Sequence, residues 1–362
     1  MSSPRKPYTV AVMLVCILAA SCSRWEPGKP KIQVPEDGLL LRGAGATFPA
    51  PLYERWFAEY QRLHPKTVVV YDRVGSGQGV KRFIGKSPEL TTDDAVDFAG
   101  SDAAMTDAEM AEVEGGVQLL PVTAGALVLA YNLPGFTIDL RLSRATYTGI
   151  FLGQITEWND PRIAQDNPGA KLPKWSIVLV TRQDSSGTTF ALTNHLSAIS
   201  TEWRDRFGAA TLVNWPGNAM RADGNAGTAG RIKGSLGSIG YVPYGFAKQL
   251  GLKMASLENK TGRFVTPSAQ SDVATLAAAS LPENLRLFFA DPEGEESYPL
   301  VTFTWILVRR KQSDSQQAAA LQDLCRWCLT EGQHLSEELG YVPLPPNVVT
   351  AAMGAVEAMD RP

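Results

Sequence analysis

Histidine is scarce in this 362-residue chain, and neither sign of charge predominates. The three histidines lie far apart with no spacing typical of metal ligands, so we expect no zinc centre, and we expect no cofactor. The formal net charge of −3 gives no bulk attraction for nucleic acid. Any anion site must therefore be local and built from a few hydrogen-bond donors. With 44% hydrophobic residues, the chain is globular and long enough for two domains.

The N-terminal residues are expected to be removed rather than folded. Arg5 and Lys6 precede the apolar run 10–20, which is too short to span a bilayer comfortably and is typical of a signal peptide over residues 1–21. Small residues then precede Cys22, a pattern that resembles a bacterial lipobox, in which the cysteine becomes the lipidated first residue of the mature protein. Ordinary cleavage beside a free cysteine is the alternative. We expect an exported protein, periplasmic or at the cell surface, anchored to a membrane through Cys22, with residues 22–38 as an extended tether.

Cysteine is also rare, with four in the chain. Cys16 would leave with the signal peptide. Cys325 and Cys328 lie within the strongly helical stretch 318–329. Redox Cys-x-x-Cys motifs lie at helix N-termini, where the dipole stabilises a thiolate. The mid-helix position favours two buried, small apolar side chains over a disulfide.

From residue 39 onward, short β-rich runs alternate with helical patterns, which predicts an α/β layered fold. Residues 223–230 are rich in glycine and asparagine and predict a flexible loop that leads into a helix. The predicted strands include 67–71, 97–100, 118–121, 176–181, 238–243 and 301–308, and the predicted helices include 52–63, 106–114, 190–200 and 316–329.

The most informative segment is 43–51 (GAGATFPAP), between an apolar run and an amphipathic one. Its glycines let the backbone bend and approach a ligand, and Pro49 and Pro51 suit the first turn of a helix. The amides around Thr47 and Phe48 would then point out of a helix N-terminus, where unpaired N–H groups and the dipole stabilise an anion.

Three further motifs follow predicted strands: 75–79 (GSGQG), 98–102 (FAGSD) and 182–189 (RQDSSGTT). The first is an amide-rich turn with a hydroxyl at Ser76, and it is not the dinucleotide fingerprint. Taken singly, Asp102 could be a helix N-cap, Arg182 a surface ion pair and Ser186 a helix cap. Four such turns at strand C-terminal ends instead indicate a shared crevice in an open α/β sheet.

At these motifs the chain resembles the phosphate-specific substrate-binding proteins of bacterial ABC importers. The match extends from residue 41 to about 349 and includes 131–135 (YNLPG), 158–160 (WND), 167–169 (NPG), 237–241 (GSIGY) and 340–345 (GYVPLP). The resemblance implies an α/β, two-lobed periplasmic-binding-protein fold (type II) with the ligand in the interlobe cleft. Residues 39–125 and 301–359 would form lobe 1 and residues 126–300 lobe 2, with crossings near Gly125 and Leu300 as the hinge.

By resemblance, the phosphate contacts fall on Thr47, Phe48, Ser76, Asp102, Arg182, Ser186, Gly187 and Thr188, and Asp184 orients the arginine. An ionised Asp102 only accepts hydrogen bonds, so it needs a proton from the ligand. Phosphate retains a proton near neutral pH and sulfate does not, so sulfate would leave two negative charges together.

The resemblance implies a monomeric receptor that binds inorganic phosphate with high affinity and delivers it to the permease subunits of an ABC transporter. We expect a binding protein and not an enzyme, with no nucleic acid among its partners. The alternatives are a phosphate-ester hydrolase that uses Ser186 or Ser76, and a phosphate-sensing lipoprotein without a transporter. Against the hydrolase, neither serine lies in a G-x-S-x-G elbow, and no histidine is close in sequence.

Overall fold

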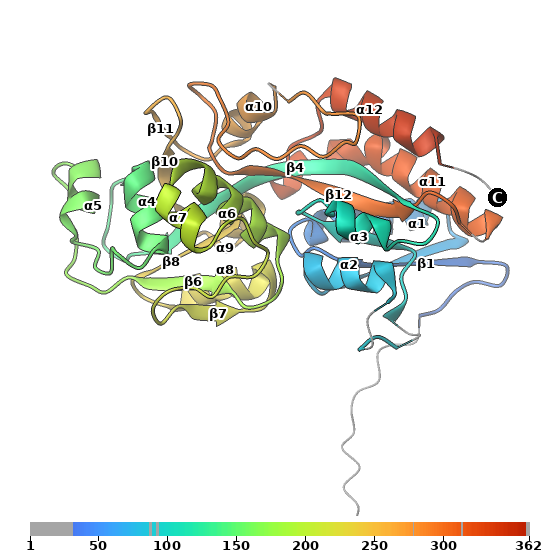
Figure 1. The fold of residues 1–362 in the computed structure, drawn as a ribbon, viewed down its shortest axis with the longest axis horizontal. Coiled ribbons are helices and arrows are strands. Elements are labelled where there is room, and N and C mark those ends of the chain that lie inside the picture. Colours follow the sequence, from blue (N-terminus) through green and yellow to red (C-terminus); the bar gives the residue numbers. More distant parts are fainter. Residues whose placement is uncertain (1–31, 87–88, 92–93, 278, 313, 360–362) are drawn as a thin grey trace, which may run out of the picture. The chain divides into compact units, whose positions relative to one another are not determined.

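Most of the strands join one sheet, and helices follow them in the order that the sequence predicts (Figure 1). The structure is a computed structural model that describes residues 32–86, 89–91, 94–277, 279–312 and 314–359. Every element below belongs to one compact unit, Val34–Pro362. The predicted signal peptide and Cys22 lie outside the described residues.

Among the described residues, nine strands form the main sheet, in the order β2-β1-β3-β12-β4-β8-β6-β7, with β9 also paired to β4. Strands β5, β10 and β11 form a small separate sheet. The strands are β1 (Leu39–Gly45), β2 (Thr67–Arg73), β3 (Phe98–Ser101), β4 (Val117–Asn132), β5 (Arg141–Leu142), β6 (Val178–Arg182), β7 (Met220–Ala222), β8 (Ser238–Pro243), β9 (Lys253–Met254), β10 (Ser256–Glu258), β11 (Phe264–Val265) and β12 (Val301–Arg309).

The helices connect and cover these strands. They are α1 (Ala50–Leu63), α2 (Ser76–Ile84), α3 (Asp107–Ala111), α4 (Arg144–Phe151), α5 (Pro161–Asp166), α6 (Gly187–Ile199), α7 (Thr201–Arg206), α8 (Gly224–Gly234), α9 (Tyr244–Leu250), α10 (Ala269–Ala277), α11 (Ser315–Leu329) and α12 (Pro346–Glu357), with short 3-10 turns at Glu331–Leu335 and Glu337–Leu339. None of the helices in the described part of the chain is long and apolar enough to cross a membrane.

Strand β4 is shared by two sets of neighbours. Its first part pairs antiparallel with β12 as far as Ala126, and its last part pairs antiparallel with β8 from Leu127 onward. The change of partner falls where the sequence places the crossings, and the amide of Leu127 donates to the carbonyl of Leu300. Strand pairing nevertheless continues through β4, and the division into lobes 39–125 with 301–359 and 126–300 stays a prediction.

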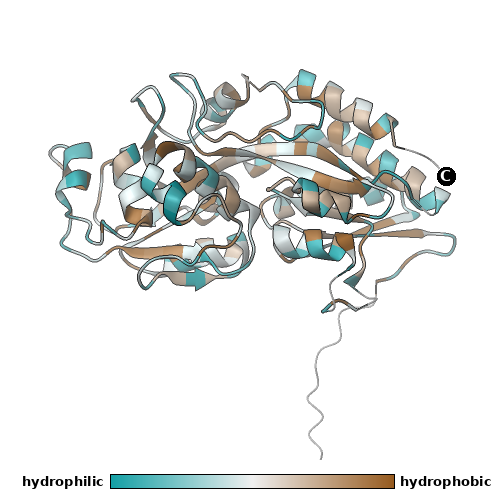
Figure 2. Cartoon of the chain, in the orientation of Figure 1, coloured by the Kyte–Doolittle hydropathy of each residue, from teal (hydrophilic) through white to brown (hydrophobic). Residues whose placement is uncertain are grey.

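The core surrounds these shared strands. Nearly every residue of β4 and β12 is buried, because both faces of the sheet are covered. Figure 2 shows hydrophobic residues concentrated along the strands. Helix α12 packs on β4, and α11 packs on α12. Cys325 and Cys328 are buried free thiols, as predicted, but they lie in the C-terminal part of α11 and not in its middle.

Two local predictions are wrong. Segment 75–79 is not a turn along its whole length, because α2 already begins at Ser76 and only Gly75, with φ 88°, precedes the helix. Segment 223–230 is not a loop either, because α8 begins at Gly224. Its buried residues recur at helical spacing and pack on β8, so tertiary burial outweighs the low helix propensity of its glycines.

A buried carboxyl lies beside the place where β4 changes partner. Asp272 of α10 is 1% exposed and accepts hydrogen bonds from the amide of Ala126 and, at 3.5 Å, from the hydroxyl of Ser271. Burial raises the pKa of Asp272 to about 7, although both hydrogen bonds oppose the shift. Ionised Asp272 therefore disfavours the fold.

Asp272→Asn should stabilise the protein in a pH-dependent way. The folded pKa lies above the ordinary value of 3.8, so the stability contributed by protonated Asp272 is present at low pH and is lost as pH rises towards 7. Asparagine stays neutral and still accepts from Ala126. We expect a gain of roughly 1–3 kcal/mol in the free energy of unfolding at pH 8 and little gain at pH 4.5, measured by denaturant titration. A gain equal at both pH values, or one matched by the exposed control Asp205→Asn, would contradict this assignment.

Candidate anion-binding site

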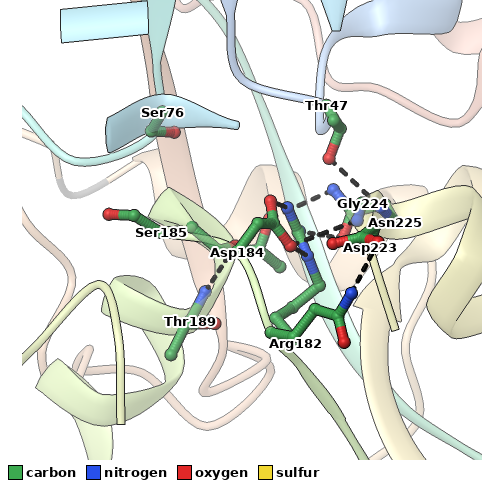
Figure 3. A network of polar contacts seen from close by, with 12 residues as sticks. Thr47, Ser76, Arg182, Asp184, Ser185, Thr189, Asp223, Gly224 and Asn225 are labelled. Atoms are coloured by element: carbon green, nitrogen blue, oxygen red, sulfur yellow. Dashed lines mark hydrogen bonds and ion pairs between the residues drawn. The ribbon is translucent and has the colours of Figure 1, made fainter. Parts of the chain in front are cut away.

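The four predicted motifs meet at one place, where β1, β3 and β6 end and α2, α6 and α8 begin. Figure 3 shows residues of three of these motifs, Thr47, Ser76 and Arg182, with Asn225 of α8. The structure brings together all the predicted contact residues except the side chain of Phe48, which packs in the core and edge-on against Tyr341. The predicted contact residues are all buried: Thr47, Phe48, Ser76, Asp102, Arg182, Ser186, Gly187 and Thr188. A groove of about 410 Å³ adjoins the site and is lined in part by Ser76, Ser101 and Ser185.

Close backbone packing requires glycine at two positions of the site. Gly45 ends β1 with φ 142°, and a Cβ there would lie 2.1 Å from the carbonyl oxygen of Gly100. Gly187 begins α6, and a Cβ there would lie 2.6 Å from Ser76 Oγ and 2.7 Å from Asp102 Cβ. The start of α6 therefore packs directly on the motifs that follow β2 and β3.

Ser76 links two of the motifs through its hydroxyl oxygen. Ser76 Oγ accepts from the amide of Gly187 at 3.1 Å and from the amide of Asp102 at 3.3 Å. Ser186 caps α6 by accepting from the amide of Thr189 at 3.1 Å. The N-termini of α2 and α6 thus lie close together, and both place positive dipole ends at the site.

Arg182 is almost fully buried, and its guanidinium is fixed on two sides. Nε donates to Asp184 Oδ1 at 2.7 Å, and the terminal nitrogen Nη2 donates to Asp184 Oδ2. Nη1 donates to Asn225 Oδ1 at 3.0 Å. Asp184 Oδ1 also accepts from the amide of Gly224 at 3.1 Å. The carboxylate that the sequence pairs with Arg182 does contact it, and a bidentate pair of this kind orients the planar guanidinium.

Asp102 is 1% exposed, and both of its carboxylate oxygens accept hydrogen bonds from hydroxyl groups. Thr304 Oγ1 donates to Oδ1 at 2.7 Å, and Thr188 Oγ1 donates to Oδ2 at 3.3 Å. Burial raises the pKa of Asp102 to about 7, and the two hydroxyls and the Arg182 charge oppose that rise. Near neutral pH this carboxyl therefore exchanges between an acceptor and a donor.

The sequence reasoning missed two residues that the structure places in the site. Asn225 is fully buried, and its amide group bridges Arg182 and Thr188, while its backbone N–H donates to Thr47 Oγ1 at 3.1 Å. Its segment looked like a loop because of its glycines, so no helix N-terminus was expected there. Thr304 lies in the middle of β12, and no sequence signal distinguishes it from other buried strand threonines.

Formal charge within the site is close to balanced. The Arg182 guanidinium faces the Asp184 carboxylate, and Asp102 adds a second acid. An anion held here would depend on hydroxyls, backbone amides and helix dipoles rather than on excess positive charge. The arrangement suits a small oxyanion that can offer a hydrogen of its own to Asp102.

Comparison with known proteins agrees with this description. A family profile described as a PBP superfamily domain matches residues 29–331, which is most of the chain. Two solved structures are similar in fold at 20% identity: a high-affinity periplasmic phosphate-binding protein (PfluDING) bound with phosphate, with a TM-score of 0.71, and the phosphate-binding protein from Stenotrophomonas maltophilia, with a TM-score of 0.68. Each similarity covers 87% of this chain and 93% of the solved one. The predicted α/β periplasmic-binding-protein fold is confirmed.

Proteins related in sequence identify the family within this superfamily. The phosphate-binding protein PstS of Pasteurella multocida (strain Pm70) is 39% identical over 314 residues, which cover 85% of this chain and 87% of that protein. PstS of Xylella fastidiosa (strain Temecula1) is 36% identical over 317 residues, which cover 86% and 83%. The chain therefore belongs to the PBP superfamily and, within it, to the PstS family of phosphate-binding proteins.

Proposed function

We propose that this protein binds inorganic phosphate with high affinity outside the cytoplasmic membrane and delivers it to the permease of an ABC importer. The observation that carries the proposal is the buried Asp102 carboxyl in a site whose other groups are mainly donors. Membership of the PstS family supports the same function.

The proposed contacts combine amides, hydroxyls and one guanidinium around the ligand. They are Thr47, Phe48, Ser76, Asp102, Arg182, Ser186, Gly187 and Thr188, with Asp184 and Asn225 holding Arg182 in place. A dehydrated anion is stable in such a site only if hydrogen bonds replace its water shell. Phosphate satisfies Asp102 through the proton that it retains, whereas sulfate has none to give.

We infer binding without hydrolysis. Both candidate serine oxygens accept from backbone amides: Ser76 Oγ from Asp102 and Gly187, and Ser186 Oγ from Thr189. Both ring nitrogens of the buried His195 contact other groups, Tyr147 and the carbonyl of Ala290. The protein should therefore not hydrolyse a chromogenic phosphate ester. Genes for a permease and an ATPase beside this one would support an importer, and their absence would favour a phosphate-sensing lipoprotein.

Ligand capture is proposed to close two lobes around the anion. Thr47, Ser76 and Asp102 belong to the first predicted lobe, and Arg182 and Asn225 belong to the second. A hydrogen bond from the amide of Asn225 to Thr47 joins residues of the two predicted lobes. Strand β4 changes its pairing partner at the boundary between these lobes. The monomeric protein would open by a hinge near residues 125–127 and 300.

Arg182→Ala should weaken phosphate binding by about 2–5 kcal/mol, because it removes a buried charged donor and leaves the Asp184 carboxylate without its cationic partner. Arg182→Lys should recover only part of that loss, since an ammonium cannot present two parallel donors. Calorimetric titration with phosphate measures both. If Arg182→Ala binds as tightly as the wild type, the site lies elsewhere.

Asp102→Asn should reduce the discrimination against sulfate, because an amide can donate as well as accept. The wild type should prefer phosphate strongly at pH 8. Its sulfate affinity should rise as pH falls below about 7, where Asp102 becomes protonated, and the Asn variant should lack that pH dependence. Paired titrations with sulfate and phosphate from pH 5.5 to 8.5 test this. Unchanged sulfate rejection in Asp102→Asn would assign the selectivity to another group.

The membrane attachment is proposed to be a lipid on Cys22, with residues 22–38 as the tether. Cys22→Ser should then release the protein into the soluble fraction or leave it unprocessed. Fractionation with mass spectrometry of the N-terminus distinguishes these outcomes, and Cys16→Ser is the matched control. A Cys22→Ser protein that remains acylated and correctly processed would disprove the anchor.

A further inference from the structure

Strand β12 brings a hydroxyl to Asp102 from far along the chain. Thr304 is fully buried, and its Oγ1 donates to Asp102 Oδ1 at 2.7 Å across a separation of 202 residues. An ionised carboxylate can only accept, so the single hydroxyl proton of Thr304 is committed to this bond. Thr304 is not among the proposed ligand contacts.

Pairing with β3 places this residue beside Asp102. Strand β12 runs antiparallel to β3 with Trp305 opposite Ser101, so Thr304 lies next to the residue that follows β3. On the other side of β12, Thr304 pairs with Thr123 and Trp305 pairs with Pro121, so the extra residue of this register shift, Val122, lies on β4. The position of Thr304 therefore follows from the regular pairing of β12 with β3.

The second carboxylate oxygen has a different kind of partner. Thr188 Oγ1 reaches Asp102 Oδ2 at 3.3 Å, which is a long hydrogen bond, and it also accepts from Asn225 Nδ2 at 3.1 Å. Thr188 is a proposed phosphate contact, so its proton can turn to the ligand. Thr304 Oγ1 would then still hold Oδ1, which leaves Oδ2 to receive a proton from the ligand.

We propose that Thr304 is a positioning residue for selectivity: it keeps Asp102 ionised and turned so that Oδ2 faces the ligand as an acceptor. The inference rests on the proposed function, since it assigns a cause to the choice of phosphate over sulfate. Without the Thr304 hydroxyl, the buried carboxyl would take up a proton itself and become a donor, which sulfate accepts.

The charges around Asp102 make this hydroxyl important. Arg182 is the charged group that opposes the effect of burial, and Thr304 opposes it more strongly than either Arg182 or Thr188 does. The charge of Asp102 also acts on three tyrosines, Tyr53, Tyr71 and Tyr341. The pKa values of these tyrosines are raised mainly by burial and to a smaller extent by Asp102. These tyrosines stay neutral, so they supply no charge that could replace the Thr304 hydrogen bond.

The test is Thr304→Val, which keeps the shape of the side chain and removes its donor. We expect sulfate affinity at pH 8.5 to rise roughly tenfold relative to wild type, because the loss of a hydrogen bond to a charged group raises the protonated fraction of Asp102, and by only a few-fold at pH 7.5, where part of wild-type Asp102 is already protonated. The sulfate pH profile should move to higher pH, because the pKa of Asp102 rises further. Calorimetric titration with sodium sulfate and sodium phosphate from pH 5.5 to 9 measures both.

Two controls separate this role from a structural one. Thr304→Ser keeps the hydroxyl and should restore the wild-type profile. Thr302→Val removes the neighbouring hydroxyl of β12, which donates to the carbonyls of Asp102 and Phe303 and not to the carboxylate, so its profile should match wild type. Thermal unfolding checks that each variant is folded, and Thr304→Ala makes the same test if the valine variant is not.

The outcomes distinguish the two proposals. Wild-type protein that binds phosphate, with Thr304→Val unchanged in sulfate affinity and pH profile, would overturn the role of Thr304 alone. Equal shifts in Thr304→Val and Thr302→Val would overturn it as well, because they would indicate a general disturbance of β12. Wild-type protein that does not bind phosphate would overturn the proposed function and this inference together.

Discussion

The arrangement depends on one strand that serves two sets of partners. Strand β4 pairs with β12 up to Ala126 and with β8 from Leu127. The strands paired with β12 and those paired with β8 are therefore held in fixed positions by the same strand. Parallel strands on each side then end towards a common site, with β1 and β3 on one side and β6 on the other. A polar site assembled from segments far apart in the sequence needs such a shared reference, because its hydrogen bonds tolerate errors of only a few tenths of an ångström.

Charge balance decides what this site can hold. A single buried guanidinium is already paired with Asp184, and Asp102 adds a carboxyl whose pKa is raised to about 7 by burial. Selectivity in such a site comes from the direction of each hydrogen bond rather than from attraction of charge, since an acceptor aimed at the ligand rejects any ion that has no proton to offer. Long-range screening by salt has little influence on a contact of this kind.

The sequence predicted the fold class and most of the residues that meet in the candidate site, because the signals were local. Strand, polar turn and helix follow one another at Arg182 and at Thr47, and the turn residues themselves carry the donors. The extent of β4 was underestimated, because Pro121 and Gly125 interrupt its apolar pattern although both are accommodated in a buried strand. Asn225 and Thr304 were missed because their importance depends on which distant side chain they meet. Hydroxyl and amide groups give no periodic signal until the strands are placed in order.

Helix α8 is rich in glycine and has a weak intrinsic helix propensity, and it carries Asn225, the side chain that bridges Arg182 and Thr188. Gly230 and Gly234 lie where a Cβ would meet nothing within 4 Å, so packing does not require glycine at either position. Each glycine favours the disordered backbone by about 1 kcal/mol relative to alanine. Ordering of this helix therefore depends on the packing of Asn225, Thr228, Ala229 and Ile232 beneath it. Fraying at the start of α8 would therefore break the hydrogen bonds of Asn225 to Arg182 and Thr188, while the pair of Arg182 with Asp184 would remain.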